Sequence, residues 1–223
     1  MVEANALSHV DGSTFPTPAL LGVDPTGDQA GAPAVLMSWL EGKPVWDSGP
    51  RRRWAGELVE LAMAIHDLAV PEPGFVRDFA PSRQRSYEPP RWAGDTKVWE
   101  RAIEIFHGPV PGPRRFIHRD FYPGNLLWRR RRLTGVVDWE SASVGPPAVD
   151  IAHCRLNFFY ATPEVADLLL IAWEQATGQP FDRWADIAAI IGVLDSLREQ
   201  PPNASGRQEL EDALALAVNA HTP

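Results

Sequence analysis

The chain has 223 residues, of which 44% are hydrophobic and 22% are charged, and this balance excludes wholesale disorder. Its formal net charge of −8 argues against a nucleic-acid partner, and its longest apolar run, residues 187–194, is too short to span a membrane. The charge and the short apolar run thus predict no nucleic acid and no membrane among its partners. The single cysteine, Cys154, excludes an internal disulfide framework and predicts a cytoplasmic protein.

The first part of the chain predicts a short helix followed by a hairpin. The helix is expected to end before the turn residues Asp11 and Gly12. Two segments with strand patterns follow, and turn-forming residues separate them. We expect a helix at residues 3–10, strands at residues 16–23 and 34–40 around a long loop, and a linker at residues 41–44.

The rest of the chain is mainly helical in pattern, because apolar residues recur at the spacing that buries one face of a helix. Proline-rich segments at residues 71–90 and 109–113 interrupt this pattern, and a β-prone hairpin lies at residues 126–139. The helices are expected at residues 53–68, 96–106, 149–160, 163–177, 181–199 and 208–219. This order predicts an α+β fold, with a small β part over residues 1–42 and a mainly helical part over residues 43–223.

The best candidate for a catalytic and metal-binding segment starts at His118-Arg119-Asp120 and extends to Asn125 and Asp138. Asp120 lies in a loop closed by a Pro-Gly pair, and Asn125 follows at the start of a strand. The hairpin then returns and brings Asp138 beside Asn125. An amide oxygen and a carboxylate at one strand end are hard ligands suited to Mg²⁺. With Asp120 as the base for an incoming hydroxyl, these are the parts that phosphoryl transfer to an alcohol requires.

The order His-Arg-Asp, four residues, Asn resembles the catalytic loop of protein kinases. With Asp138-Trp139 in place of Asp-Phe-Gly, the segment resembles the aminoglycoside phosphotransferase family of kinase-like small-molecule phosphotransferases. Three further segments resemble that family: residues 135–152 around the metal-binding strand, residues 3–7 as the helix whose glutamate pairs with the ATP lysine, and residues 35–42 as the strand and hinge that receive adenine. The resemblance runs in order from residue 3 to about residue 160.

The resemblance implies a protein-kinase-like fold and an ATP-dependent phosphotransferase that uses Mg²⁺ and acts on a hydroxyl of a small molecule. The roles that it implies are a catalytic base at Asp120, metal ligands at Asn125 and Asp138, and an adenine-binding backbone at Ser38, Trp39 and Leu40.

The resemblance also implies structural roles around the site. His118 and Asp150 would brace the catalytic loop by hydrogen bonds. The acceptor pocket would lie in the helical part, between residues 71 and 115 and after residue 160. Pro146 departs from the family, in which an aspartate is usual at this position.

The front of the family's pattern is missing from this sequence. No G-x-G-x-x-G segment occurs, and both lysines, Lys43 and Lys97, follow the hinge, so neither is the strand lysine that grips the phosphates. Glu3 would then lack its ion-pair partner. We expect a truncated nucleotide-binding lobe, caused by a gene start assigned downstream of the true one, and the alternative is a degenerate member of the family.

Two other classes of function stay open on the sequence. A non-catalytic kinase-like binding module, or pseudoenzyme, would keep the helical part and lack ATP turnover, and the missing lysine favours it. A metal-dependent hydrolase built on His118, Asp120 and Asp138 would need a second clustered histidine, which the segment lacks. Binding of Mg·ATP would discriminate the enzyme from the binding module.

Overall fold

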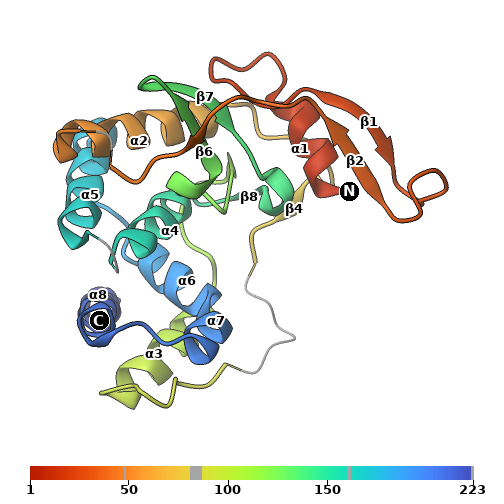
Figure 1. Cartoon of the computed structure of the whole chain (residues 1–223). Coiled ribbons are helices and arrows are strands. Elements are labelled where there is room, and N and C mark those ends of the chain that lie inside the picture. The colour runs from red at the N-terminus through yellow and green to blue at the C-terminus, as the bar shows by residue number, and fades with distance from the viewer. Residues whose placement is uncertain (48, 81–86, 160–161, 222–223) are drawn as a thin grey trace.

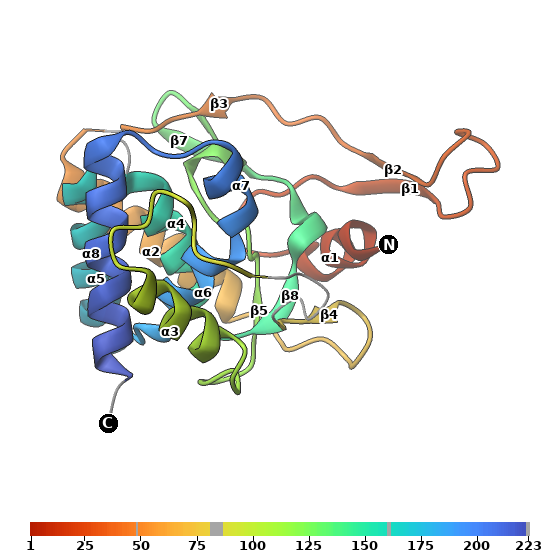
Figure 2. The same cartoon turned by 90° about the horizontal axis from the view of Figure 1, so that it is seen from below.

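The structure is a computed structural model that describes residues 1–47, 49–80, 87–159 and 162–221. Figure 1 shows a helical body at one side and, at the other, helix α1 (Val2–Val10) with the hairpin of β1 (Leu20–Asp24) and β2 (Ala34–Met37). Figure 2, turned by 90°, shows the remaining short strands between these two parts. The chain order of a small β part and then a mainly helical part agrees with the prediction.

The β1–β2 hairpin is antiparallel, as predicted, but its strands are shorter than the expected segments. Pro16 and Pro18 lack the N–H that a strand ladder needs, so β1 begins only at Leu20. The loop is closed by Asp24, whose carboxylate accepts hydrogen bonds of 2.8–3.1 Å from the backbone N–H groups of residues 27–30. These bonds, foremost that from Ala30, lower the pKa of Asp24. The loop is therefore held by local contacts.

The helical body is built around α2 (Arg51–His66), α4 (Ala148–Phe159), α5 (Pro163–Thr177) and α6 (Trp184–Gly192). The buried residues of α2 fall three or four positions apart, so one face of this helix is apolar. That face packs against α5, while α4 packs against both α5 and α6. Helix α4 is buried along most of its length, and it positions the residues behind the catalytic loop.

Two of the predicted helices differ by more than two residues from the observed ones. The single helix expected over residues 181–199 is wrong, because α6 ends at Gly192 and α7 (Leu194–Glu199) begins after Val193. Glycine is a poor helix former, and Val193 has non-helical backbone angles. Helix α8 (Ala204–Ala220) begins earlier than residue 208, since the side chain of Asn203 caps it. Helix α3 (Thr96–Phe106), capped by Asp95, has the expected bounds.

Two small sheets connect the two parts of the molecule. In the first, β3 (Lys43–Pro44) pairs with β6 (Leu126–Arg129), and β6 pairs with β7 (Arg132–Val136). The second has the order β4 (Arg77–Asp78), β8 (Ser143–Gly145) and β5 (Arg115–Ile117). Strand β4 was not predicted, because its two residues pair with a distant strand and have no local strand pattern.

The architecture is α+β with a mainly helical C-terminal part, which confirms the predicted class. The division between residues 42 and 43 stays a prediction. The described helices include none with the length and apolarity needed to cross a membrane.

Candidate active site

The catalytic loop follows β5 and is held by Asp150, which is fully buried in the first turn of α4. The Asp150 carboxylate accepts the backbone N–H of His118 at 3.0 Å and that of Arg119 at 2.6 Å. It also bonds Nε2 of His66 at 2.8 Å. Burial by itself raises the pKa of Asp150, but the hydrogen bonds from His66 and Arg119 outweigh it, so the pKa lies below its usual value. The bracing role predicted for Asp150 is confirmed.

His118 connects the catalytic loop to the strand that leads to Asp138. Its buried ring bonds through Nε2 to the carbonyl oxygen of Val137 at 3.0 Å. Because this partner is an acceptor, Nε2 carries the proton. Burial lowers the pKa of His118, which favours the neutral ring. His118 therefore braces the loop, as the resemblance implied.

Asp120 lies at the centre of the site, and both of its carboxylate oxygens have partners. Oδ1 lies 2.9 Å from Nε2 of His153, and Oδ2 accepts a 2.8 Å hydrogen bond from Nδ2 of Asn125. Burial raises the pKa of Asp120, but the hydrogen bonds from His153 and Asn125 outweigh it and hold the pKa below its usual value. The group is therefore an ionised carboxylate near neutral pH.

His153 was not predicted as a site residue. It stands three positions after Asp150 in α4, so both side chains lie on one face of that helix. This spacing was the available signal in the sequence, once Asp150 was assigned behind the catalytic loop.

The β6–β7 hairpin brings Asn125 and Asp138 to one end, as the spacing predicted. The backbone oxygen of Asn125 accepts the N–H of Val137 at 3.0 Å, and Asp138 is the next residue. Nδ2 of Asn125 donates to the carboxylate of Asp120 and, at 2.9 Å, to its backbone oxygen. The amide oxygen of Asn125 therefore remains for a cation. Asp138 is exposed and has a left-handed φ of 66°.

Several acidic side chains, among them Asp120, Asp138 and Glu140, lie near this end of the hairpin and make the electrostatic potential negative there. Burial and the charges of Asp120 and Asp138 raise the pKa of Tyr122. Burial and the charges of Asp138 and Glu140 raise the pKa of Glu3 on α1. Glu3 makes no ion pair with a described residue. A bound cation would relieve this mutual repulsion.

The donor set suits Mg²⁺ held together with a nucleotide. The described residues include no group of three or more His, Cys, Asp or Glu side chains that could hold a metal by itself. Asn125 and Asp138 supply two hard oxygen ligands, and Mg²⁺ is commonly bound by one or two carboxylates plus the phosphates of a substrate.

The segment expected to receive adenine follows β2. The backbone N–H of Ser38 donates to the carbonyl oxygen of Ala19, and the backbone N–H of Ala19 donates to the hydroxyl oxygen of Ser38, both at 2.9 Å. Leu40 lies against β7, since a Cβ added at Gly135 would stand 2.7 Å from Leu40 Cδ1. Trp39 is 90% exposed. The N–H of Ser38 is already bonded, so its C=O and the backbone groups of Trp39 and Leu40 are left for adenine, and this role stays a prediction.

Two adjoining cavities share Asp120, His153 and Val193. The larger, of about 480 Å³, has mainly apolar walls beside the Asp120 carboxylate, with polar side chains at Asn157, Ser196 and Gln200. The smaller, of about 300 Å³, includes Arg77, Phe79 and Arg119. Both contain residues from the regions in which the acceptor pocket was expected.

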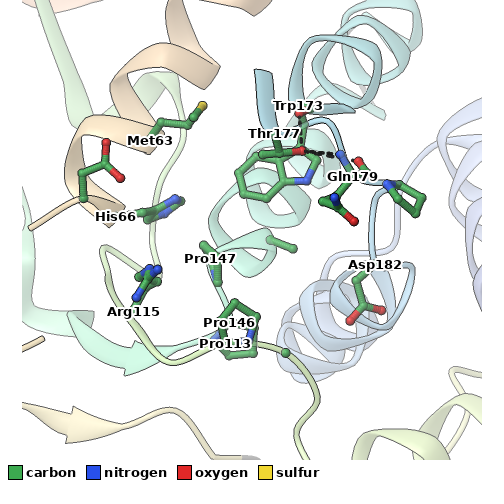
Figure 3. Close-up of a pocket in the computed structure, with 14 residues that line it drawn as sticks. Met63, His66, Pro113, Arg115, Pro146, Pro147, Trp173, Thr177, Gln179 and Asp182 are labelled. Atoms are coloured by element: carbon green, nitrogen blue, oxygen red, sulfur yellow. Dashed lines mark hydrogen bonds between the residues drawn. The ribbon is translucent and has the colours of Figure 1, made fainter. Parts of the chain in front are cut away.

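A third cavity, of about 310 Å³, contains none of the predicted site residues. Figure 3 shows Met63 and His66 of α2 on one side of it and Trp173 and Thr177 of α5 on another. Pro146, the position that departs from the family pattern, also lines this cavity. His66 belongs to the network that braces the catalytic loop, because its Nε2 bonds Asp150.

Comparison with known proteins agrees with this geometry. Residues 2–190 match the model of the phosphotransferase enzyme family. A homoserine kinase of Beijerinckia indica is 31% identical over 156 residues, which are 62% of this chain and 46% of that enzyme. An N-acetylmuramate/N-acetylglucosamine kinase of Neisseria meningitidis serogroup B is 28% identical over 135 residues, 54% of this chain and 39% of that enzyme. The chain thus spans less than half the length of these relatives.

Solved structures share the fold at low sequence identity. Aminoglycoside phosphotransferase APH(4)-Ia has a TM-score of 0.67 at 16% identity, over 99% of this chain and 82% of that one. A thermostable mutant of it, in a ternary complex with ADP and hygromycin B, has a TM-score of 0.65 at 15% identity, over 100% and 83% of the chains. Macrolide 2'-phosphotransferase MphH from Brachybacterium faecium has a TM-score of 0.57 at 19% identity, over 100% and 80%. The kinase-like fold is confirmed, and the chain belongs to the phosphotransferase enzyme family.

Proposed function

We propose that this chain carries the catalytic part of an ATP-dependent phosphotransferase that acts on a hydroxyl of a small molecule. The observation that supports this most is the amide of Asn125. Its nitrogen fixes the base, Asp120, through two hydrogen bonds, and its oxygen is left for the cation beside Asp138. One residue thus links the base to the metal ligands, as in-line transfer to a hydroxyl requires.

In this proposal Asp120 is the catalytic residue. As an ionised carboxylate it accepts a hydrogen bond from the acceptor hydroxyl and takes up the proton as the oxygen bonds to the γ-phosphorus. Its lowered pKa makes it a weak base, so its main contribution is to orient the hydroxyl. The contact with His153 keeps Oδ1 from rotating away from the acceptor cavity.

Asn125 and Asp138 would hold Mg²⁺, which neutralises the phosphate charges when it is bound. Trp39 and Leu40 would offer backbone groups to adenine. A structural relative that contains ADP and hygromycin B in one complex supports a nucleotide site and an acceptor site on this fold.

The test measures ADP formation by the purified chain with Mg²⁺ and hydroxyl acceptors drawn from the relatives: homoserine, N-acetylmuramate, N-acetylglucosamine and hygromycin B. We expect Asp120→Asn to lower turnover at least about 100-fold, because a positioned base contributes that much. Asp212→Asn, an exposed aspartate of α8, is the matched control and should leave turnover unchanged. Equal turnover in the Asp120 variant would refute the assignment.

A second candidate is the non-catalytic binding module. The observation that favours it is the lack of a lysine near Glu3, since Lys43 lies in β3 and Lys97 in α3. Titration calorimetry with Mg·ATP separates the two functions. Heat of binding that Asp138→Asn abolishes supports the phosphotransferase, and the absence of binding supports the module.

A further inference from the structure

Arg119, the middle residue of His118-Arg119-Asp120, has a side chain that the bracing of the loop does not use. Only its backbone N–H bonds Asp150. Its backbone has a left-handed φ of 69°. The guanidinium carbon lies 4.9 Å from the ring centre of Phe79, and both residues line the 300 Å³ cavity that contains Asp120.

A second arginine lines the same cavity from another element. Arg77 stands on β4, which pairs with β8. Its guanidinium makes one long bond, of 3.3 Å, to the backbone oxygen of Glu140. The neighbouring carboxylate, Asp78, forms an ion pair with Arg114 at 2.6 Å. Neither Arg77 nor Arg119 forms an ion pair with a carboxylate of the described residues.

Two cations on one cavity wall repel each other. Burial and the charge of Arg77 both lower the pKa of Arg119, although an arginine stays protonated in a protein. Arg77 is exposed, but Arg119 is half-buried, and a half-buried charge without an ion pair is unfavourable unless an anion compensates it. Guanidinium groups match the planar, two-oxygen geometry of a carboxylate, so the pair is suited to bind one.

We propose, on the basis of the phosphotransferase function above, that the acceptor is a hydroxylated carboxylic acid whose carboxylate is bound by Arg77 and Arg119 and whose hydroxyl meets Asp120 in the same cavity. The acceptor oxygen forms a bond to the γ-phosphorus, the bond from that phosphorus to the bridging oxygen breaks, and its electron pair leaves with ADP. The hydroxyl proton goes to Asp120.

The charges around the cavity select among acceptors. The arginines repel a polycationic amine, so this cavity is not built for one. A phosphate monoester would carry nearly twice the negative charge of a carboxylate beside Asp120, which favours the carboxylate. The adjoining cavity of about 480 Å³, which shares Asp120 with this one, leaves room for the rest of the acceptor.

The experiment measures binding to the full chain without ATP, by ligand-observed NMR. The probes have the same four-carbon frame and differ in charge: 4-hydroxybutyrate, 1,4-butanediol and 4-amino-1-butanol. We expect the acid to bind at least about tenfold more tightly than the diol, as charge-assisted hydrogen bonds allow, and the amine to bind most weakly. Equal affinity for acid and diol would overturn the proposal. Tighter binding of glycerol 3-phosphate than of the acid would overturn the choice of carboxylate.

Variants connect this selectivity to the two arginines. Arg119→Gln and Arg77→Gln should each abolish the preference for the acid, and Arg119→Lys should keep part of it. Arg52→Gln, an exposed arginine of α2 outside the cavity, is the matched control. If Arg119→Gln does not fold, Arg77→Gln carries the test by itself, and an unchanged preference in that variant would refute the proposal.

Failure of this inference and failure of the phosphotransferase function give different results. Selective binding of the acid without ADP formation supports the arginine site and counts against phosphotransfer. ADP formation with neutral or cationic acceptors, and none with acids, supports phosphotransfer and overturns the arginine site.

Discussion

Asn125 donates two hydrogen bonds from one nitrogen to Asp120, at 2.8 Å to the carboxylate and at 2.9 Å to the backbone oxygen. The two residues are five positions apart, and a 3₁₀ turn over Pro123–Asn125 separates them. The contact fixes the conformation of the Asp120 side chain and the direction of the Asn125 amide together. The position of the proposed base and the position of the proposed metal ligand are therefore not independent.

The first prediction concerns this amide. Asn125→Ala should lower turnover at least about 100-fold, because it removes a metal ligand and frees the base at once. The free energy of unfolding should fall by only about 1 kcal/mol, the value of a typical hydrogen bond. Steady-state kinetics over a range of Mg²⁺ concentrations and urea unfolding measure the two effects. Asn219→Ala, an exposed residue of α8, serves as the control.

Removal of His153 should change the pH dependence of catalysis. Hydrogen bonds from His153 and Asn125 hold the pKa of Asp120 down against the effect of burial, so the pKa should rise in His153→Ala. The acidic limb of kcat/KM would then move to higher pH. In His153→Gln the amide still donates to Asp120, and the limb should stay near its original position. If both variants give the wild-type profile, His153 does not act on Asp120.

Asp150 should make the stability of the protein sensitive to acid. Its pKa in the folded chain lies below the value of 3.8 for an unperturbed aspartate, because the hydrogen bonds outweigh burial. The stability that it contributes is therefore complete above that value and is lost as the pH falls through the folded pKa. Urea unfolding between pH 3 and 6 should show a smaller loss on acidification for Asp150→Asn than for the wild type.

At neutral pH, Asp150→Asn should itself be less stable by about 3 kcal/mol, since a buried network loses its acceptor. Asp212→Asn is again the control, because that carboxylate is exposed. A variant as stable as the wild type would contradict the role of Asp150 in holding the loop.

The buried pair between Arg155 of α4 and Asp186 of α6 should stabilise the helical body. Arg155 Nη1 lies 2.8 and 2.9 Å from the two carboxylate oxygens, and both residues are buried. Arg155→Met should lower the free energy of unfolding by about 3 kcal/mol, because the buried carboxylate of Asp186 then keeps only its 3.2 Å contact with the partly exposed Arg183. The double variant Arg155→Met, Asp186→Leu should recover most of this loss.

The exposed i,i+4 pair Arg53–Glu57, 2.7 Å apart, is the comparison for the buried pair. Its disruption should change stability by no more than about 0.5 kcal/mol. Thermal or urea unfolding of the wild type, of the two variants of the buried pair and of a variant of the exposed pair measures both values. A loss for Arg155→Met as small as that for the exposed pair would contradict the assignment.

The errors in the sequence analysis have identifiable physical causes. The run from residue 181 to residue 199 is apolar enough for one helix, but Gly192 and Val193 break it, and apolarity alone does not locate such a break. Strand β4 consists of two residues whose pairing with β8 is long-range. Helix α3, which Asp95 caps, has the predicted bounds, whereas α8, which Asn203 caps, begins at Ala204 and not at residue 208.

The sequence by itself determined the chemistry of the catalytic loop, because Asp120, Asn125 and Asp138 belong to one short turn and one hairpin whose register is local. Only the tertiary structure decided what surrounds that loop. His153 reaches Asp120 because Asp150 bonds α4 to the loop after β5, and Arg77 reaches the cavity beside Arg119 because β4 pairs with β8. Such contacts depend on how elements distant in the chain are oriented in the packed core, and no local pattern of residues specifies that orientation.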